Sequence, residues 1–379
     1  QHASEVDPAL AMGPYKLGTV YMRLGRADDA KECFRKALEL DPEYPEALNN
    51  LGIHLAGNRE LDVAESLYRK ALAKRIDYFE AHINLGNLLV ESGRRIEALY
   101  FYERAMQLRP DSALAKQRMG PLLRDLGRIA EAVEILNQAI YLDPHSAEAW
   151  NDIGACHISR GDISTAENAL KEALRLDRNL IPAWINLMLI SNWRSRDRAG
   201  VYALHCSFGQ HMMELTVDSR FSSFPNVVDK ERRLRVGFVS GDFRRHSVSY
   251  FIRGPLSYLN RTKVEAWAYF NHSREDERTQ ELKPLFEEWR NIHGLADKEA
   301  AEIVRRDGID ILFDLTGHTG HSRLGLFALK PAPVQISWIG YPNTTGLPTI
   351  DYRLTDNFAD PVGSSEEFHT ENLIRFPNC

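Results

Sequence analysis

The stretch NNLGIHLAGNRELDVAESLYRKA, residues 49–71, recurs in pattern along the first half of the chain with a period of 34 residues. Alanines follow its glycine after 12 and 19 residues, and a bulky residue stands between them, as Ala64, Tyr68 and Ala71 do here. The glycines in register are Gly18, Gly52, Gly86, Gly120 and Gly154. A helix–turn–helix unit of this length is the tetratricopeptide pattern, in which small residues let two antiparallel helices approach closely.

Five complete units and the first helix of a sixth, around Trp184 to Asn192, can be aligned in this way. Proline closes three of the units because it cannot continue a helix. The spacing therefore predicts a tetratricopeptide superhelix over residues 11–190, with no strand up to about residue 178. Such an array is a module for binding partners, and by itself it indicates no chemistry.

The first helix of each unit is expected to line a concave groove. Two residues before the repeat glycine stand Asn50 and Asn84, and Asn186 holds the same position in the sixth unit. An amide is both donor and acceptor, so these asparagines could hold the backbone of an extended protein substrate. The plainer interpretation, which the spacing alone favours, is that they are solvated surface residues. The equivalent positions of the other three units hold Lys16, Arg118 and Asp152, so the series of asparagines is interrupted.

The second half changes to alternating strands and helices. Apolar runs predict strands at 234–240, 264–270, 309–315, 334–339 and 352–355, and helices are expected at 279–289 and 298–307. This alternation is typical of a mainly parallel α/β sheet covered on both faces. Residues 191–233 are expected to be a helical linker, and residues 234–379 a Rossmann-like lobe.

Composition excludes several classes of protein. The 379 residues carry a formal net charge of −6 and no long basic run, so no nucleic-acid partner is expected. No apolar run approaches the roughly 20 residues that a membrane span needs, so no membrane role is expected. The four cysteines are scattered without paired spacing, as in a chain of the reducing cytoplasm. A cytoplasmic protein is therefore expected, or also a nuclear one if the source is eukaryotic.

Loops after the predicted strands are the places to search for a site, because ligands bind at the carboxyl ends of parallel strands. Three loops stand out, at residues 241–251, 316–321 and 338–348. The first strand lacks the GxGxxG pattern of nicotinamide or flavin proteins, which weighs against an oxidoreductase. His318 and His321 could suggest a metal site, but no third ligand is visible nearby, and no Asp-x-Asp pair occurs. No metal is therefore expected.

These same loops carry a resemblance. Repeats followed by RVGFVSGDFRRHSVSYF (235–251), DGIDILFDLTGHT (307–319) and KPAPVQISWIGYPNTTG (330–346) resemble the SPINDLY/O-GlcNAc transferase family, over nearly the whole chain. The motif variants are closer to the SPINDLY branch. The resemblance implies an α-helical repeat solenoid followed by the N-terminal Rossmann-like lobe of a GT-B glycosyltransferase. The family's second lobe is absent, so we expect a fragment that is inactive alone and binds the nucleotide sugar weakly or not at all.

The resemblance also implies an activity. Protein substrates would bind in the repeat groove and receive a sugar on Ser or Thr, most simply N-acetylglucosamine from UDP-GlcNAc. The alternatives are fucose from GDP-fucose, or a repeat scaffold with a degenerate lobe. His246 matches the family histidine proposed as the catalytic base, although a carboxylate or the donor phosphate has also been considered. His246 could instead only position the donor or acceptor.

The remaining site expectations are contacts to the nucleotide sugar. His318 and Thr319 end the third predicted strand, where they could contact the donor, although His318 could equally cap or pack. The run Asn343, Thr344, Thr345 and Gly346 could bind ligand from a flexible loop, but it is also an ordinary turn sequence. Asp242 could cap the helix that follows it. Asp310 opens a strand and is expected to be structural.

Overall fold

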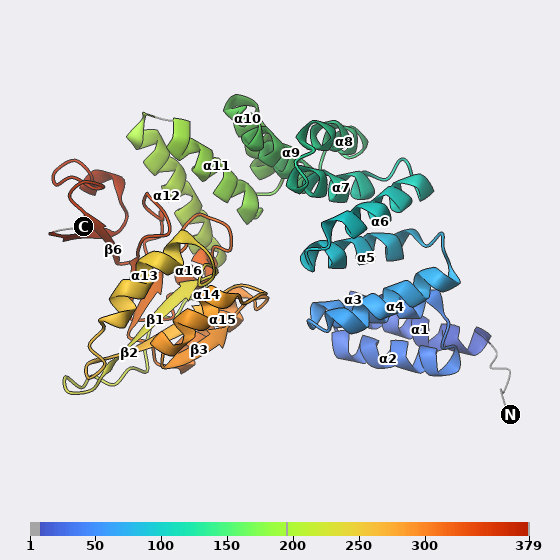
Figure 1. Cartoon of the computed structure of the whole chain (residues 1–379), viewed down its shortest axis with the longest axis horizontal. Coiled ribbons are helices and arrows are strands. Elements are labelled where there is room, and N and C mark those ends of the chain that lie inside the picture. The colour runs from blue at the N-terminus through green and yellow to red at the C-terminus, as the bar shows by residue number, and fades with distance from the viewer. Residues whose placement is uncertain (1–7, 195, 378–379) are drawn as a thin grey trace. The chain divides into compact units, whose positions relative to one another are not determined.

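The computed structural model describes residues 8–194 and 196–377, and the chain divides into two compact units, residues 1–183 and 184–379 (Figure 1). Helices make up the first unit, and the second combines a sheet with helices. Among the described residues, no helix has the length and apolar character needed to cross a membrane.

The first unit is a run of helix pairs, one pair for each repeat. Residues 11–178 contain helices and turns but no strand, which confirms the all-helical prediction for this span. The helices are α1 (Pro8–Arg23), α2 (Ala27–Leu40), α3 (Pro45–Gly57), α4 (Leu61–Lys74), α5 (Phe79–Glu91), α6 (Arg95–Leu108), α7 (Ala113–Asp125), α8 (Ile129–Leu142), α9 (Ala147–Ser159) and α10 (Ile163–Leu176).

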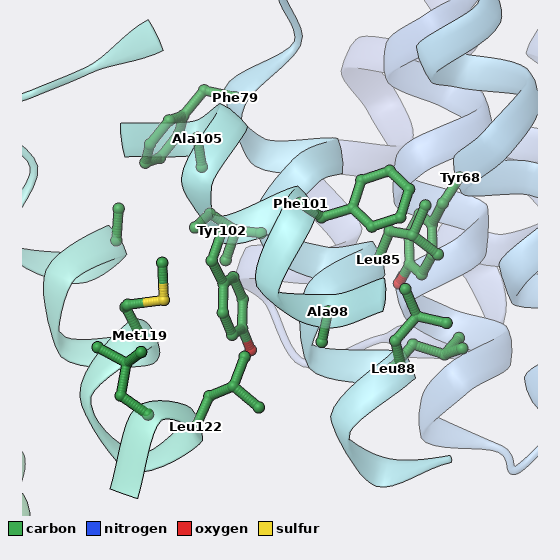
Figure 2. Packing of buried hydrophobic residues seen from close by; sticks show 14 of the residues in the cluster. Tyr68, Phe79, Leu85, Leu88, Ala98, Phe101, Tyr102, Ala105, Met119 and Leu122 are labelled. Carbon is green, nitrogen blue, oxygen red and sulfur yellow. The ribbon is translucent and has the colours of Figure 1, made fainter. Parts of the chain in front are cut away.

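The two helices of a repeat meet where the repeat glycine faces the bulky residue of the second helix. A Cβ added at Gly86 would lie 2.4 Å from the ring of Tyr102, and one at Gly52 would lie 2.7 Å from Tyr68. Figure 2 shows Tyr68 and Tyr102 within the apolar cluster that runs through successive repeats. Only glycine leaves room for the ring at this position, which explains why the 34-residue spacing of glycines predicts the fold.

The second unit is built around a parallel sheet. Its strands are β1 (Leu234–Ser240), β2 (Val264–Phe270), β3 (Glu288–Asn291), β4 (Ile311–Asp314), β5 (Val334–Ser337), β6 (Tyr352–Asp356) and β7 (Asn372–Phe376). The strand order is β3-β2-β1-β4-β5-β6-β7, and every pairing is parallel. Strands β2 and β3 are therefore added on one side of β1. The chain then crosses over, and β4 to β7 are added on the other side.

Helices α11 (Ile181–Arg194), α12 (Arg198–Leu215), α13 (Ser247–Ser257), α14 (Glu277–Leu282), α15 (Asp297–Arg306) and α16 (Leu324–Ala328) accompany the sheet, with 3-10 turns η1 (Lys283–Leu285) and η2 (Glu366–Phe368). Helix α13 covers one face, because Val248 and Ile252 share an apolar cluster with Val236 and Phe238 of β1. This packing fixes the start of α13 beside the carboxyl end of β1.

One sequence expectation differs from the structure. The helix predicted over 279–289 is wrong in its second half, because α14 ends at Leu282 and β3 begins at Glu288. Pro284 lacks a backbone N–H and stops the helix. Residues 191–233, predicted as a helical linker, contain α12 and lie within the second unit. Within it, the Phe221 backbone N–H donates to Leu329 O at 2.9 Å, and Asn226 Nδ2 donates to Asp310 Oδ1 at 2.7 Å.

Gly86→Ala should destabilise the repeat unit by about 1–3 kcal/mol, because the added methyl overpacks against the Tyr102 ring. The ring cannot easily yield, since its hydroxyl donates to Asn87 Oδ1 at 2.7 Å. The change is measured by urea unfolding followed by far-UV circular dichroism.

Gly57→Ala is the matched control, because no atom lies within 4 Å of a Cβ built at that helical glycine. It should leave stability unchanged or raise it by up to about 1 kcal/mol, the ordinary helix preference for alanine. Equal destabilisation by both substitutions would show that the close contact with Tyr102 is not the reason why a residue larger than glycine is disfavoured at position 86.

Candidate functional site

The candidate site lies at the carboxyl ends of β1 and β4. These strands are neighbours, and the strand order reverses between them, which in open parallel sheets creates a crevice where ligands bind. The loop 241–246 leaves β1 at this point, and the loop 315–323 leaves β4. Two of the three loops singled out by sequence therefore flank one crevice.

His246 is the residue immediately before α13 and caps its first turn. Its Nδ1 accepts a hydrogen bond from the Val248 backbone N–H at 3.3 Å, and 42% of its side chain is exposed. A neutral imidazole that accepts at Nδ1 carries its proton on Nε2. In this tautomer Nε2 cannot accept a proton. To act as a base through Nε2, the ring must first place a proton on Nδ1.

Asp242 is the group positioned to hold such a proton. Its side chain is 7% exposed, and its Oδ2 lies 3.7 Å from His246 Nδ1. Arg244 approaches the other oxygen at 3.9 Å. In the described part of the chain, the carboxylate accepts no hydrogen bond. The expected helix-capping role of Asp242 is wrong, because His246 takes that position.

Two further histidines face the same loops. His272 follows β2, His321 follows β4, and their ring centroids are 4.9 Å apart. Burial lowers the pKa of both imidazoles, so they are neutral near pH 7. Sequence reasoning missed His272, although its place after a correctly predicted strand was a usable signal.

His318 does not share this surface with His321. Its ring is completely buried against Phe208, Tyr341 and His205, and its Nε2–H donates to Thr345 O at 2.7 Å. The packing alternative therefore describes its position, and contact with the donor stays a prediction. No cluster of three metal-ligating side chains occurs among residues 8–194 and 196–377. Thr319 Oγ1 donates to Thr316 O at 2.9 Å.

The loop 343–346 is held in place by hydrogen bonds and close packing. Thr344 Oγ1 and the Thr345 backbone N–H donate to the buried Glu371 carboxylate at 2.6 and 2.7 Å. Gly346 has a φ of +76°, and a Cβ there would lie 2.0 Å from His205 O. The expectation of a flexible loop is therefore wrong.

Asn343 is the member of this loop that reaches a pocket. Its Nδ2 donates to Asn192 Oδ1 at 2.9 Å, and it lines a pocket of about 270 Å³ with Arg198 and Phe368. Ligand contacts by Thr344, Thr345 and Gly346 stay predictions.

Two carboxylates, Asp307 and Asp310, precede β4. They therefore lie at the amino ends of the strands, whereas His246 lies at the carboxyl ends. Asp310 accepts from Arg232 Nη1 at 2.7 Å and from the Arg235 backbone N–H at 2.9 Å. Asp307 accepts from Tyr269 Oη at 2.8 Å and forms an ion pair with Arg290 at 2.6 Å. Both side chains are used in holding the sheet together, and neither is near His246.

Asn50 and Asn84 lie on α3 and α5 in the first unit and are partly exposed. Asn49 joins them, since Asn84 Nδ2 donates to Asn49 Oδ1 at 2.9 Å and Asn49 Nδ2 donates to Asn50 Oδ1 at 3.1 Å. In the described part of the chain, the amide oxygen of Asn84 accepts no hydrogen bond. Asn186 lies on α11, in the second unit.

Known proteins match both units. Tetratricopeptide repeats match residues 15–78, 53–113, 89–143 and 123–188. A mutant of Thermobaculum terrenum O-GlcNAc transferase is similar in structure, with a TM-score of 0.72 and 32% sequence identity over 79% of this chain and 57% of that one.

Curated relatives include plant proteins named "Probable UDP-N-acetylglucosamine--peptide N-acetylglucosaminyltransferase SPINDLY". The Petunia hybrida protein is 42% identical over 182 residues (47% of this chain), and the Arabidopsis thaliana protein is 44% identical over 164 residues (42% of this chain). The chain spans 19% and 18% of the length of these two relatives. Glycosyl transferase family 41 itself matches residues 176–379, more than half of the chain. The chain therefore belongs to glycosyl transferase family 41.

Proposed function

We propose that this chain is part of a protein O-glycosyltransferase that moves N-acetylglucosamine from UDP-GlcNAc to Ser or Thr of protein substrates. The observation that carries the proposal is the placement of His246, half exposed at the start of α13, in the switch-point crevice of a family 41 lobe. The plant relatives and a Caenorhabditis elegans protein are named as peptide N-acetylglucosaminyltransferases, which supports the acceptor class and the sugar.

The proposed reaction is a single displacement. The acceptor hydroxyl oxygen forms a bond to the anomeric carbon, the bond from that carbon to the diphosphate oxygen breaks, and UDP leaves with the bonding electrons. The acceptor proton passes to His246 Nε2, with the Nδ1 proton directed toward Asp242. A neutral imidazole can accept a proton at its unprotonated ring nitrogen.

The leaving diphosphate needs stabilisation from cationic side chains or helix N-termini. Because the chain spans less than a fifth of the length of the two plant relatives, we propose that most of these groups lie outside it. No metal is invoked. The complete protein is therefore the correct material for every activity test below.

The donor is tested by incubating the full-length protein and a Ser/Thr-containing peptide with labelled UDP-GlcNAc or GDP-fucose. Transfer of label from UDP-GlcNAc supports the proposal. Transfer from GDP-fucose alone would replace the donor and keep the reaction class.

We also propose that the first unit recruits the protein substrate. The free amide oxygen of Asn84 and the relay from Asn84 through Asn49 to Asn50 support recognition of a peptide backbone, because an amide carbonyl can accept from a peptide N–H. Contact with a peptide by Asn186, which lies on α11 in the second unit, is a separate prediction.

In the full-length protein, His246→Asn should lower the rate of sugar transfer by roughly 10²–10⁴-fold, the usual cost of losing a general base. Asparagine is chosen because its side chain can still cap α13, so folding is preserved. Single-turnover transfer to a peptide measures the chemical step, and calorimetric binding of UDP should be unchanged.

Asp310→Asn is the comparison, because Asp310 pairs with Arg232 far from the crevice. It should lower thermal stability while leaving turnover per folded molecule near normal. Near-normal transfer by His246→Asn, together with loss of transfer in a folded Asp310→Asn protein, would move the base assignment to the carboxylate.

Asp152 stands two residues before the repeat glycine of the fifth unit. It should make the stability of the first unit depend on pH. Burial raises the pKa of this carboxyl from 3.8 to about 6. Since the folded value exceeds the unfolded one, its contribution to stability is fully present below about pH 4 and is lost as pH rises through about 6. Asp152→Asn should therefore stabilise the unit by about 1–3 kcal/mol at pH 8 and have little effect at pH 4.

Urea unfolding at the two pH values measures this difference. Asp111→Asn is the control, because Asp111 is exposed in the turn after α6. An Asp152→Asn effect that is the same at both pH values would contradict the assignment.

A further inference from the structure

We propose that Asp242, His272 and His321 form a subsite that binds the hydroxyl groups of the donor sugar ring. This inference deepens the proposed function and rests on it. The three residues come from the loops after β1, β2 and β4, three strands that are adjacent in the sheet. They therefore meet at the edge of the sheet that carries His246.

The subsite has hydrogen-bonding capacity that the protein does not use. Asp242 is nine-tenths buried, yet its carboxylate accepts no hydrogen bond in the described part of the chain. A buried carboxylate of this kind needs donors. His272 Nδ1 is occupied by the Arg274 backbone, whose N–H and O lie at 3.0 and 3.1 Å. Its Nε2 has no partner among the described residues, and neither ring nitrogen of His321 has one.

The backbone of His321 is strained. Its φ is +64°, in the left-handed region that residues with a Cβ seldom occupy. Asn271 Nδ2 donates to His321 O at 2.9 Å, and the Cβ of His321 packs where only a glycine, Gly241, leaves room. Such strain persists only when the surroundings impose it, and it is concentrated at functional sites. Here it keeps the imidazole against the loop that carries Asp242.

The chemistry of the set favours a neutral, hydroxyl-rich ligand. A carboxylate accepts, and a neutral imidazole offers one donor and one acceptor, so the set matches hydroxyl groups that both donate and accept. The negative charge of Asp242 and the positive charge of Arg244, 3.9 Å apart, both act on the two imidazoles, so the set has no net positive charge that would select a phosphate. A sugar ring bound here would lie beside His246, the proposed base.

The decisive variant is His321→Gly in the full-length protein. Glycine adopts a φ of +64° without strain, so the imidazole is removed while folding is preserved or improved. Losing one or two hydrogen bonds to the sugar should raise the KM for UDP-GlcNAc roughly two- to tenfold, with kcat little changed. Affinity for UDP, which lacks the sugar, should stay the same. Asp242→Asn should also raise the KM for UDP-GlcNAc, and it should lower kcat as well, because Asp242 is proposed to hold the Nδ1 proton of His246.

Arg59→Gly is the matched control, because Arg59 has a φ of +68° in the turn after α3, within the repeat unit. It should leave all kinetic constants unchanged. An unchanged KM for UDP-GlcNAc in His321→Gly overturns the subsite, as does an equal loss of UDP affinity or a change confined to the KM of the acceptor peptide.

A second experiment distinguishes failure of the proposed transferase function from failure of the proposed subsite. If the full-length protein transfers neither sugar, the subsite is judged by saturation-transfer NMR with free N-acetylglucosamine. Transfer of magnetisation to the sugar that is lost in both His321→Gly and Asp242→Asn supports the subsite. Absence of transfer in the unsubstituted protein, or transfer that survives both substitutions, overturns it.

Discussion

Close packing of a side chain or backbone against glycine is the constraint on which both units depend. In the repeats, the ring of Tyr102 occupies the space where Gly86 has no Cβ. In the α/β unit, the same absence lets Tyr341 pack on Gly317 and lets Gly346 approach the His205 carbonyl oxygen. Each contact joins segments that no regular hydrogen-bond ladder connects. The repeat contact recurs at a fixed spacing and is visible in the sequence, whereas the contacts in the second unit occur once each.

That difference explains which parts of the fold could be predicted. Periodic glycines indicated the helices, and β-branched and apolar runs located β1 and β2 to the residue. The end of α14 was missed although Pro284 marks it, because the run after it remained compatible with a helix. The burial of loop 343–346 could not be predicted, since its partners Glu371 and His205 lie 26 and more than 130 residues away. Local sequence shows a turn there and says nothing about what covers it.

The candidate site divides in the same way. The resemblance led to His246, and the strand order explains its position, because α13 is anchored to β1 by its apolar face. His272 and the strained backbone of His321 emerged only from the packing of the loops. The histidine that appeared equally attractive in the sequence, His318, is instead a buried residue that joins α12 to the loop after β5. Its pKa is lowered well below the ordinary value by burial, so it serves there as a neutral hydrogen-bond donor.

In the proposed mechanism, the tautomer of His246 would link donor binding to catalysis. While Nδ1 accepts from the Val248 N–H, the proton sits on Nε2, and the ring stabilises the helix but cannot accept a proton. If the ring loses the Nε2 proton to solvent, gains one on Nδ1 and rotates toward Asp242, now 3.7 Å away, a charge-assisted hydrogen bond replaces the helix cap and Nε2 is free to accept. A carboxylate has about four lone-pair positions, so Asp242 can accept from a sugar hydroxyl and from His246 at once. A ligand that draws Asp242 and His246 into one hydrogen-bonded set would therefore create the basic tautomer only when the donor is in place, which would protect the donor from attack by water before the acceptor arrives.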